Sequence, residues 1–422
     1  MRVLMLSWEF PPVLVGGLGR HVHALSAALV RAGHEVTVVT RHQAGVPYTE
    51  RVDGVDVVRV PEDPLLLSLS NDTLLPWAMG FNHALTRAAL RVARAGRFDV
   101  VHAHDWLVAH AAVTVKEQLD LPLVVTVHAT EAGRHQGWLP GETNRTIHSV
   151  EHWLVQQASR LLVCSQYMRW EIGRLLDARA DRVDVVPNGV HWQAWQPTPP
   201  SVLRVRRRFA GAGPLLGFAG RLVYEKGVQN ILEAMPELRC RYPGLRLVVA
   251  GDGPYRATLE ELARQYGVSR AVSFTGFLGG GLPGAMAAFD VMIVPSLYEP
   301  FGMVAIEGAA TGAPLVVADT GGLREFVDDH RTGVMFAPGD AAALTAAIRC
   351  SVDDRPAARG MARQARTLVY ERYGWSGIAT GTVAAYRRAR RATAGFSSAG
   401  AAVVATPVRL REISGRNLLT GV

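Results

Sequence analysis

Short runs of valine, leucine and isoleucine alternate with longer segments of helical periodicity along most of the chain. The runs are nearly continuous in apolar residues, as in strands covered on both faces, and the alternation predicts parallel sheets with right-handed crossovers. In the first half the predicted strands are Val3–Ser7, Glu35–Thr40, Val55–Val60, Asp99–His104, Leu123–His128, Leu161–Ser165 and Val183–Pro187. In the second half they are Leu215–Ala219, Leu245–Ala250, Val272–Thr275, Val291–Pro295, Leu315–Ala318 and Val334–Phe336.

The two series of strands predict an α/β fold of two doubly wound, Rossmann-like domains that face each other across a cleft. Ligands of such sheets bind at the carboxyl ends of the strands. Between the two series lies a segment with three prolines and an arginine cluster, which is typical of a linker. The predicted parts are an N-terminal domain over 1–190, a linker over 191–213, a C-terminal domain over 214–373, a final helix over 374–391 and a mobile tail over 392–422.

Size and composition agree with this organisation. The chain has 422 residues, too many for one ordinary core, and 49% of them are hydrophobic and 19% charged. No apolar run approaches the roughly 18 residues of a membrane helix, so we expect no stable membrane insertion. The start, Met1–Ser7, is too short for a signal peptide, and three well-separated cysteines predict neither a disulfide framework nor a metal site. These features predict a cytoplasmic protein.

The formal net charge of +8 raises the question of a nucleic-acid or anionic membrane partner. The arginines gather in the predicted linker and at the end of the last helix, without the aromatic-interleaved repeats or zinc-finger spacing of nucleic-acid-binding proteins. We therefore expect no nucleic-acid partner. Only two of the 45 basic residues are lysines, and one of them, Lys226, lies just after a predicted strand.

The stretch Glu299-Pro-Phe-Gly-Met-Val-Ala-Ile-Glu307 carries the strongest chemical signal. It follows a predicted strand and places Gly302 and Met303 where a helix would begin, so free backbone N–H groups and the positive end of the helix dipole face an anion. Such N–H groups suit a phosphate, and the flanking carboxylates suit hydroxyls. The stretch therefore predicts a nucleotide-sugar site. The spacing alone is equally compatible with a structural helix start that has Glu299 as its cap and Glu307 on a solvated face.

A second glycine-rich segment, Gly16-Gly17-Leu18-Gly19, follows the first predicted strand and precedes a helical pattern. Glycines there let backbone N–H groups approach an oxyanion or phosphate closely. A dinucleotide site would need Gly-x-Gly-x-x-Gly directly after the strand, whereas the loop Trp8–Val15 intervenes here. The pattern favours a sugar- or phosphate-facing loop over a nicotinamide dehydrogenase.

Histidines mark the ends of two predicted strands. His128 is expected to point into the cleft, where it can donate a hydrogen bond to a sugar hydroxyl; a buried structural histidine is the alternative. His102 and His104 alternate on the strand that leads into Asp105, but no third ligand with suitable spacing is visible. We interpret these two histidines as structural or acceptor-facing.

Neither His-Glu-x-x-His nor Asp-x-Asp occurs in the chain. Asp-x-Asp is the carboxylate pair with which many sugar transferases hold a divalent ion on the diphosphate. We therefore predict no metal and no cofactor. Positive side chains must then neutralise a leaving diphosphate, and Arg221 and Lys226 are the candidates.

In combination, these motifs resemble the retaining glycosyltransferases of the two-domain GT-B architecture, specifically family 4 and the related bacterial glycogen synthases. His102-Ala-His-Asp-Trp106 and Tyr298-Glu-Pro-Phe-Gly302 are similar to that α-glucan-synthesising branch. Ser7-Trp-Glu-Phe-Pro-Pro12 and Val127-His-Ala-Thr-Glu-Ala-Gly-Arg-His135 are most similar to the actinobacterial α-1,4-glucosyltransferases of glycogen and methylglucose polysaccharide synthesis. The resemblance covers about residues 1–390.

The resemblance implies a role for each motif. The catalytic residues would be Arg221 and Lys226 on the leaving diphosphate, with His128 and Glu299 on the donor sugar. The other donor-binding residues would be Gly16, Gly17, Leu18, Gly302, Met303 and, on the ribose, Glu307. The residues nearer the acceptor, on the N-terminal domain, would be Asp105, Glu131, Arg134 and His135. The final helix would return onto the first domain.

The resemblance also implies the reaction: retaining, metal-independent transfer of glucose from ADP-glucose or UDP-glucose to an α-1,4-glucan or related polysaccharide. One position departs from the glycogen synthases, which usually carry a lysine where this chain has Val15; Arg20 is the candidate to replace it. Three alternatives stay open: transfer from another donor such as GDP-mannose to a lipid or glycan, a nucleotide-sugar epimerase of similar architecture, and a non-catalytic glycan-binding module.

Overall fold

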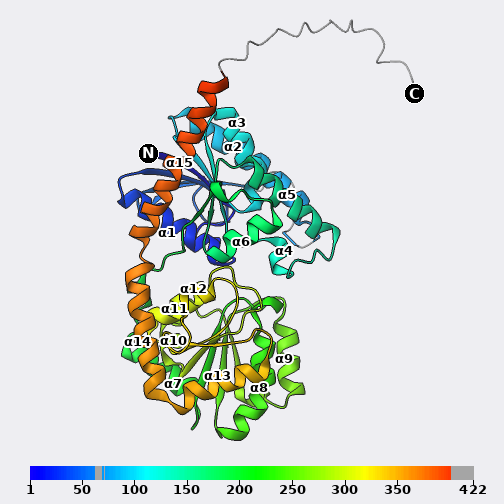
Figure 1. Ribbon diagram of the computed structural model, residues 1–422, viewed down its shortest axis with the longest axis vertical. Helices are drawn as coiled ribbons and strands as arrows, with labels where there is room; N and C mark the ends of the chain where they lie inside the picture. Colours follow the sequence, from blue (N-terminus) through cyan, green and yellow to red (C-terminus); the bar gives the residue numbers. More distant parts are fainter. Residues whose placement is uncertain (62–68, 71, 401–422) are drawn as a thin grey trace, which may run out of the picture.

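The computed structural model consists of two α/β domains that follow each other along the long axis, each built around its own twisted sheet (Figure 1). It describes residues 1–61, 69–70 and 72–400, with side chains described as far as residue 393. Strands of nearly continuous apolar sequence are buried on both faces by helices, as their composition requires. The predicted fold class is confirmed.

The N-terminal sheet has eight strands in the order β3-β4-β2-β1-β5-β6-β7-β8. They are β1 (Arg2–Leu6), β2 (Glu35–Arg41), β3 (Thr49–Val52), β4 (Val55–Val60), β5 (Val100–His104), β6 (Leu123–Val127), β7 (Arg160–Val163) and β8 (Val183–Val185). The sequence pattern missed β3, because this antiparallel edge strand is partly exposed along its length and has no apolar run. The α-helices of the N-terminal domain are α1 (Gly17–Arg31), α2 (Leu74–Arg94), α3 (Ala109–Leu119), α4 (Glu131–Arg134), α5 (Glu142–Gln157) and α6 (Gln166–Leu175).

The C-terminal sheet has six parallel strands in the order β11-β10-β9-β12-β13-β14. They are β9 (Leu215–Ala219), β10 (Arg246–Ala250), β11 (Val272–Gly276), β12 (Val291–Val294), β13 (Leu315–Ala318) and β14 (Val334–Phe336). Its α-helices are α8 (Val228–Arg241), α9 (Arg256–Gln265), α10 (Leu282–Ala288), α11 (Met303–Thr311), α12 (Leu323–Phe326), α13 (Ala341–Asp353) and α14 (Arg355–Arg372).

The segment 191–213 is more structured than the linker that the sequence predicted. It contains α7 (Pro199–Phe209), which packs against α10 of the C-terminal domain. Pro199 and Pro200 occupy the first turn of α7, where a missing backbone N–H leaves no helical hydrogen bond unmade. The prolines that suggested a linker therefore start a helix.

The last helix, α15 (Trp375–Gly400), returns to the N-terminal domain and packs along α1 (Figure 1). Its Tyr386 is fully buried in the same core cluster as Leu25 of α1. The helix continues through 392–400, so the prediction of a tail is wrong for these residues. The remainder of the predicted tail, 401–422, lies outside the described residues.

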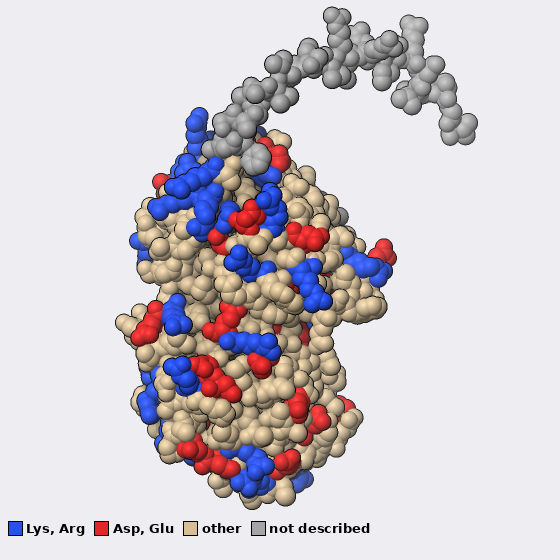
Figure 2. All heavy atoms as spheres, viewed as in Figure 1, with Lys and Arg blue, Asp and Glu red and all other residues tan. Residues whose placement is uncertain are grey.

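Basic side chains gather at the end of the molecule where α15 leaves the N-terminal domain (Figure 2). Arg388 pairs with Asp184 at 2.9 Å, and Arg390 pairs with Asp99 at 3.3 Å. Part of the C-terminal arginine cluster therefore helps to dock α15. Within the described parts of the chain, no helix is both long and apolar enough to cross a membrane.

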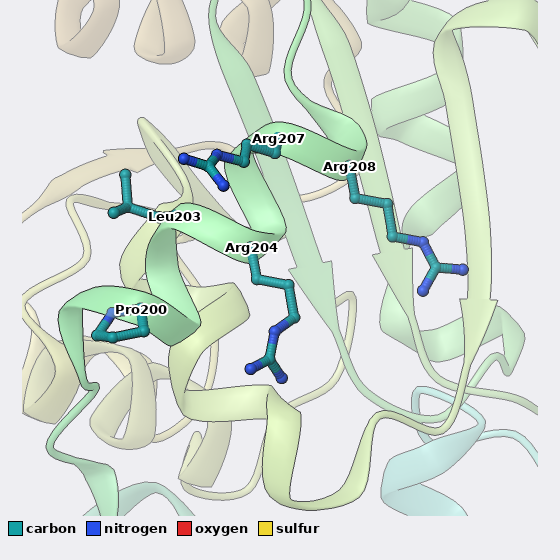
Figure 3. A pocket seen from close by; sticks show the side chains of 5 residues that line it. All are labelled: Pro200, Leu203, Arg204, Arg207 and Arg208. Atoms are coloured by element: carbon teal, nitrogen blue, oxygen red, sulfur yellow. The ribbon is translucent and has the colours of Figure 1, made fainter.

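The arginine cluster of α7 lines a cavity of about 460 Å³ on the C-terminal domain. In Figure 3 its arginine side chains spread in different directions instead of converging on one point. The lining residues are Pro200, Leu203, Arg204, Arg207 and Arg208. This cavity is therefore not an assembled anion site, and it is built from residues that carry none of the predicted chemistry.

Candidate active site

The glycine-rich loop before α1 is held by a buried carboxylate, Glu9. One oxygen of Glu9 accepts hydrogen bonds from the N–H groups of Val15 at 2.9 Å, Gly16 at 3.1 Å and Gly19 at 3.4 Å. The predicted phosphate-facing N–H of Gly16 is thus already used by the protein itself. Among the described residues, the N–H groups of Gly17 and Leu18 have no acceptor, so these two remain available to a ligand.

The start of α11 faces the start of α1 across the cleft. A methyl group added at Gly17 would lie 3.9 Å from the side chain of Met303. Gly302 caps α11 with φ of 100°, and a side chain there would come within 2.5 Å of Leu323, so only glycine fits. Both helices therefore present their positive ends to the same space, one from each domain.

Two arginines from opposite domains lie near each other and pair with none of the described residues. The guanidinium groups of Arg134, at the end of α4, and Arg221, after β9, form no ion pair or hydrogen bond with any described residue. Partial desolvation, and then the positive charge of Arg134, lower the pKa of Arg221. Two unpaired cations that repel each other are suited to an anion that binds between them.

Lys226 and Glu299 are brought together, as the donor site requires, but they pair with each other. Lys226 Nζ lies 2.7 Å from Glu299 Oε2, and Ser296 Oγ donates to the same oxygen at 3.1 Å. Gly227 permits this approach, because a side chain there would collide with the carbonyl oxygen of Pro295. The lysine thus already neutralises the carboxylate that was predicted to bind sugar hydroxyls.

Glu307 is buried in α11 and forms an ion pair with Arg20 of α1, with Oε1 2.6 Å from the arginine Nη1. The sequence assigned Glu307 to the ribose and offered Arg20 as a replacement for a missing lysine. In the structure the two residues bridge the domains. Burial, opposed by Arg20, raises the pKa of Glu307 to about 7. Its second oxygen, Oε2, is buried and has no hydrogen-bond partner in the described part of the chain.

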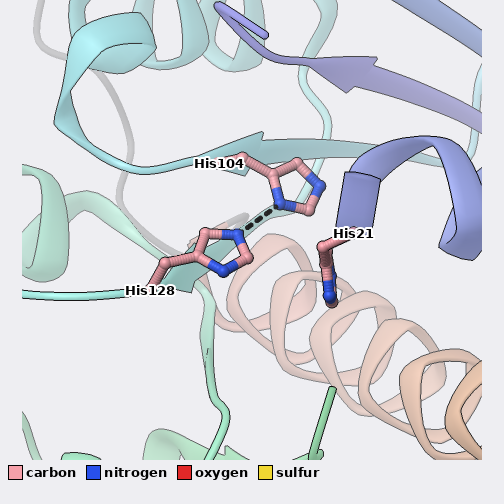
Figure 4. Close-up of side chains that lie close together, drawn as sticks. All are labelled: His21, His104 and His128. Carbon is pink, nitrogen blue, oxygen red and sulfur yellow. Dashed lines mark hydrogen bonds between the residues drawn. The ribbon is translucent and has the colours of Figure 1, made fainter. Parts of the chain in front are cut away.

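His128 lies directly after β6, at the carboxyl end of the strand, and is partly exposed. Its Nε2 lies 3.1 Å from Nδ1 of His104 at the end of β5 (Figure 4). Burial lowers the pKa of His128 to about 4, so the ring is neutral near pH 7. A neutral imidazole with one nitrogen engaged presents its other nitrogen to a ligand.

The sequence offered no third histidine near His102 and His104, and the structure supplies one. His21, from the second turn of α1, lies against His128 with ring centroids 4.8 Å apart and an interplanar angle of 78°. His102, in contrast, turns into the core, where it bonds to Tyr386 of α15 and Thr126, both at 2.7 Å. His102 is therefore structural.

Asp105 holds the backbone of His128 in place. Its Oδ1 accepts a hydrogen bond from the backbone N–H of His128 at 2.7 Å. The residue has φ of 59° and ψ of 178°, a backbone conformation that residues with a side chain rarely adopt. Burial raises the pKa of this carboxyl to about 7. Of the predicted acceptor-side residues, Asp105 thus lies deepest.

Glu131 and His135 belong to a local cluster at the start of α5. Glu131 Oε1 lies 3.4 Å from His135 Nε2 and accepts Asn144 Nδ2 at 2.5 Å. The backbone N–H of Glu131 donates to Glu151, whose pKa is raised to about 8 by burial. The predicted acceptor-side residues therefore form two groups, a deep one at Asp105 and an outer one around Glu131.

A buried contact between the domains was not foreseen from the sequence. Tyr298, from the loop after β12, donates its hydroxyl to Glu171 of α6 at 2.8 Å. Thr130 donates to the same carboxylate oxygen at 2.7 Å. At the neighbouring edge, Ser165 Oγ donates to the carbonyl oxygen of Pro300 at 2.7 Å. These bonds hold the Glu299–Glu307 stretch against the N-terminal domain.

Comparison with known proteins identifies the family. The sequence model of Glycosyltransferase Family 4 matches residues 15–193, and that of Glycosyl transferases group 1 matches residues 203–368. A glycogen synthase of Mycobacterium tuberculosis is 43% identical over 403 residues, which cover 93% of this chain and 95% of the relative. The chain belongs to glycosyltransferase family 4.

Solved structures agree with this assignment. A sucrose-phosphate synthase from Thermosynechococcus elongatus superposes with a TM-score of 0.80 at 25% identity, over 92% of this chain and 98% of that one. The catalytic domain of Starch Synthase IV from Arabidopsis thaliana, bound to ADP and acarbose, gives a TM-score of 0.74 at 19% identity, over 93% and 99%. The fold of this glycosyltransferase is the GT-B architecture.

Sequence reasoning missed three groups of this glycosyltransferase's site: Glu9, His21 and the pair Tyr298–Glu171. A signal existed for His21, because it follows Gly17 by four residues and so shares its face of the helix. Glu9 lies in the Trp8–Val15 loop, where an acidic residue among apolar neighbours was the only sign of its burial. The Tyr298–Glu171 contact joins residues 127 positions apart, and no local pattern marks it.

Proposed function

We propose that this glycosyltransferase transfers glucose from ADP-glucose or UDP-glucose to an α-1,4-glucan or related polysaccharide, with retention of configuration and without a metal. The observation that carries the proposal is the facing pair of helix starts at Gly17 and Met303 with the unpaired Arg221 beside them. Its M. tuberculosis relative, which aligns over nearly the whole chain, is named a glycogen synthase and so supports glucose and a glucan.

The donor diphosphate binds between the two helix starts. Arg221 of the C-terminal domain and Arg134 of the N-terminal domain approach it from opposite sides, with Lys226 at the sugar end. As the bond from the anomeric carbon to the phosphate oxygen breaks, negative charge grows on the diphosphate. Cations placed there stabilise the transition state more than the ground state, and this difference accelerates the reaction.

The donor sugar lies between Glu299 and His128. Diphosphate binding draws Lys226 away from Glu299, which frees that carboxylate to accept sugar hydroxyls. His128, neutral at pH 7, donates a hydrogen bond to a hydroxyl near the reacting carbon. The unpartnered Oε2 of Glu307 accepts a ribose hydroxyl. Retention follows when the acceptor hydroxyl attacks from the face of the departing phosphate, which takes up its proton.

An acceptor surface lies beyond Asp105. The loop after α4 carries Trp138, whose side chain is 69% exposed. An exposed indole face offers a platform for the apolar face of a glucose unit, and the polar cluster of Glu131 and His135 lies nearby. The outer acceptor-side residues therefore suit the next glucose units of a glucan chain.

Nucleotide release by the purified protein tests the proposal. ADP-glucose, UDP-glucose and GDP-mannose are each incubated in EDTA, with and without a maltooligosaccharide. Acceptor-dependent release of ADP or UDP, with a lengthened α-1,4 product, is the expected result and identifies the donor. Release from GDP-mannose alone would assign another sugar, and acceptor-independent conversion of the sugar would indicate an epimerase.

A further inference from the structure

Three histidines from three separate segments lie close together (Figure 4). His21 comes from α1, His104 from the end of β5 and His128 from the position after β6. One ring nitrogen of each lies within 4.8 Å of those of the other two. His104 and His128 already approach to 3.1 Å.

The hydrogen bonding of this cluster is incomplete. Both ring nitrogens of His21 and the Nε2 of His104 are buried and form no hydrogen bond of ordinary geometry with the described residues, although the side chain of Asn188 lies close enough to His21 to oppose the lowering of its pKa. Buried polar atoms are nearly always paired in proteins, so unpaired nitrogens require an explanation. His102, two residues before His104, shows the ordinary solution, because both of its nitrogens are bonded.

We propose that His21, His104 and His128 bind a divalent transition-metal ion, with zinc as the best match. Neutral imidazoles are the preferred nitrogen ligands of zinc, at about 2.0–2.1 Å, whereas magnesium and calcium require oxygen ligands. Nitrogens that share one tetrahedral ion lie about 3.4 Å apart. Nδ1 of His104 and Nε2 of His128 lie 3.1 Å apart as a hydrogen-bonded pair, close to this spacing, so the ion would replace that hydrogen bond. The third ligand atom, from His21, lies within 4.8 Å of the other two and must move closer to reach the ion.

The ion is an inhibitor of transfer, an effect that rests on the proposed function. His128 is the residue that we place on the donor sugar, and coordination to zinc fixes its ring in the orientation of the metal site instead of the one that meets the sugar hydroxyl. A zinc ion at this position also places a positive charge where the sugar must lie. The same protein therefore transfers without a metal and is switched off by zinc.

Metal binding is measured first, on the full chain without any donor. The protein is stripped with EDTA and desalted, then titrated with zinc against a chromophoric chelator. One zinc per chain is expected. Loading with Cu²⁺ and counting nitrogen ligands by EPR provides a measurement on the unaltered protein, with three imidazoles expected. No tight zinc, or a copper spectrum without several nitrogens, would overturn the site.

The matched variants are His21→Asn and His110→Asn. His110 is a partly exposed histidine of α3 that packs against Trp153 with the two rings tilted by 33° and lies outside the cluster. We expect His21→Asn to weaken zinc binding at least tenfold and His110→Asn to leave it unchanged. Melting temperatures of both variants show whether they are folded. Equal zinc affinity in folded His21→Asn protein would contradict the proposal.

Inhibition is tested separately, once a donor is known. Zinc titrated into the transfer assay is expected to inhibit the wild type, and EDTA is expected to restore its rate. His21→Asn, compared with its own rate in EDTA, is expected to need at least tenfold more zinc. Binding without inhibition would leave the metal site standing and remove His128 from the donor sugar. Failure of the transfer assay itself leaves the binding result unaffected.

Discussion

The residues that the two domains contribute to the candidate site differ in their charge. The C-terminal face presents charged groups at its surface: Arg221 has no partner among the residues that the structure describes, and Lys226 is paired with Glu299 at 2.7 Å. The N-terminal face presents groups whose charged forms are disfavoured by burial, including His128 with a pKa of about 4 and Asp105 with a pKa of about 7. A diphosphate matches the first face, and a sugar with its uncharged hydroxyls matches the second.

The difference follows from where each group is attached. The charged groups of the C-terminal face stand on loops after β9 and β12, where water reaches them. The polar groups of the N-terminal face stand at strand ends beneath α1, where desolvation disfavours their charged forms. Arg134 is one exception, because it is a cation carried by the N-terminal face and exposed to solvent.

Removing a charge from the C-terminal face gives the largest expected effect. Lys226→Ala is expected to lower turnover about 10²–10³-fold, because a group that stabilises transition-state charge is lost. Lys116→Ala is the matched control, since Lys116 is the other lysine and forms an ion pair with Glu117 on α3. Turnover and melting temperature are measured for both. Unchanged turnover in Lys226→Ala would remove this lysine from the site.

Substitution of Arg134, a cation on the N-terminal face, tests whether the difference in charge between the two faces decides where the diphosphate binds. Arg134→Ala is expected to lower kcat/KM for the nucleotide-sugar about 10–10²-fold, because one charge-assisted contact to the diphosphate disappears. Arg145→Ala removes an exposed arginine of the nearby α5 and serves as the control. If both variants behave like the wild type, Arg134 belongs to the acceptor side, as the sequence suggested.

Glu9, the buried carboxylate that holds the glycine-rich loop, allows a third test on the N-terminal face. Glu9→Ala leaves three N–H groups without their acceptor and is expected to reduce the free energy of unfolding by about 1–3 kcal/mol. Glu9→Gln keeps a carbonyl oxygen and is expected to lose less. Urea denaturation of both variants provides the measurement. Equal stability of Glu9→Ala and the wild type would show that the loop does not depend on this carboxylate.

The smallest expected effect is on the pH dependence of stability. It distinguishes a buried histidine, His128, from a buried carboxyl group, Glu307. His128 has a lowered pKa in the folded state, so its contribution is present above pH 6.5 and is lost as pH falls through about 4. Glu307 has a raised pKa, so its contribution is present below about pH 4.5 and is lost as pH rises through about 7.

Urea denaturation from pH 4 to 8 compares the wild type with His128→Asn and Glu307→Gln. The stability of the wild type relative to His128→Asn is expected to fall on acidification. Its stability relative to Glu307→Gln is expected to fall as pH rises. Parallel curves for all three proteins would mean that neither group titrates differently in the folded and unfolded states.

The structure brings together several residues that the sequence assigned to the candidate donor site. The Glu299–Glu307 stretch and Lys226 each carry their chemistry in a local pattern of strand, glycine and helix. The pairing of Lys226 with Glu299 and of Glu307 with Arg20 could not be predicted, because each joins segments that are distant along the chain. Within the predicted linker and the first part of the predicted tail, prolines and small residues that were read as loop signals are accommodated in the helices α7 and α15.

By itself, the sequence determined the fold class, the two domains and the strand ends that carry chemistry, because apolar runs and glycine turns act over a few residues. Only the tertiary structure decided which groups meet. It brought His21, His104 and His128 together from three segments and gave the backbone N–H of Gly16 an acceptor in Glu9. It also placed the N-terminal ends of α1 and α11 next to each other. It also set the charges of the buried groups, since burial fixes a pKa and depends on the packing of the whole chain.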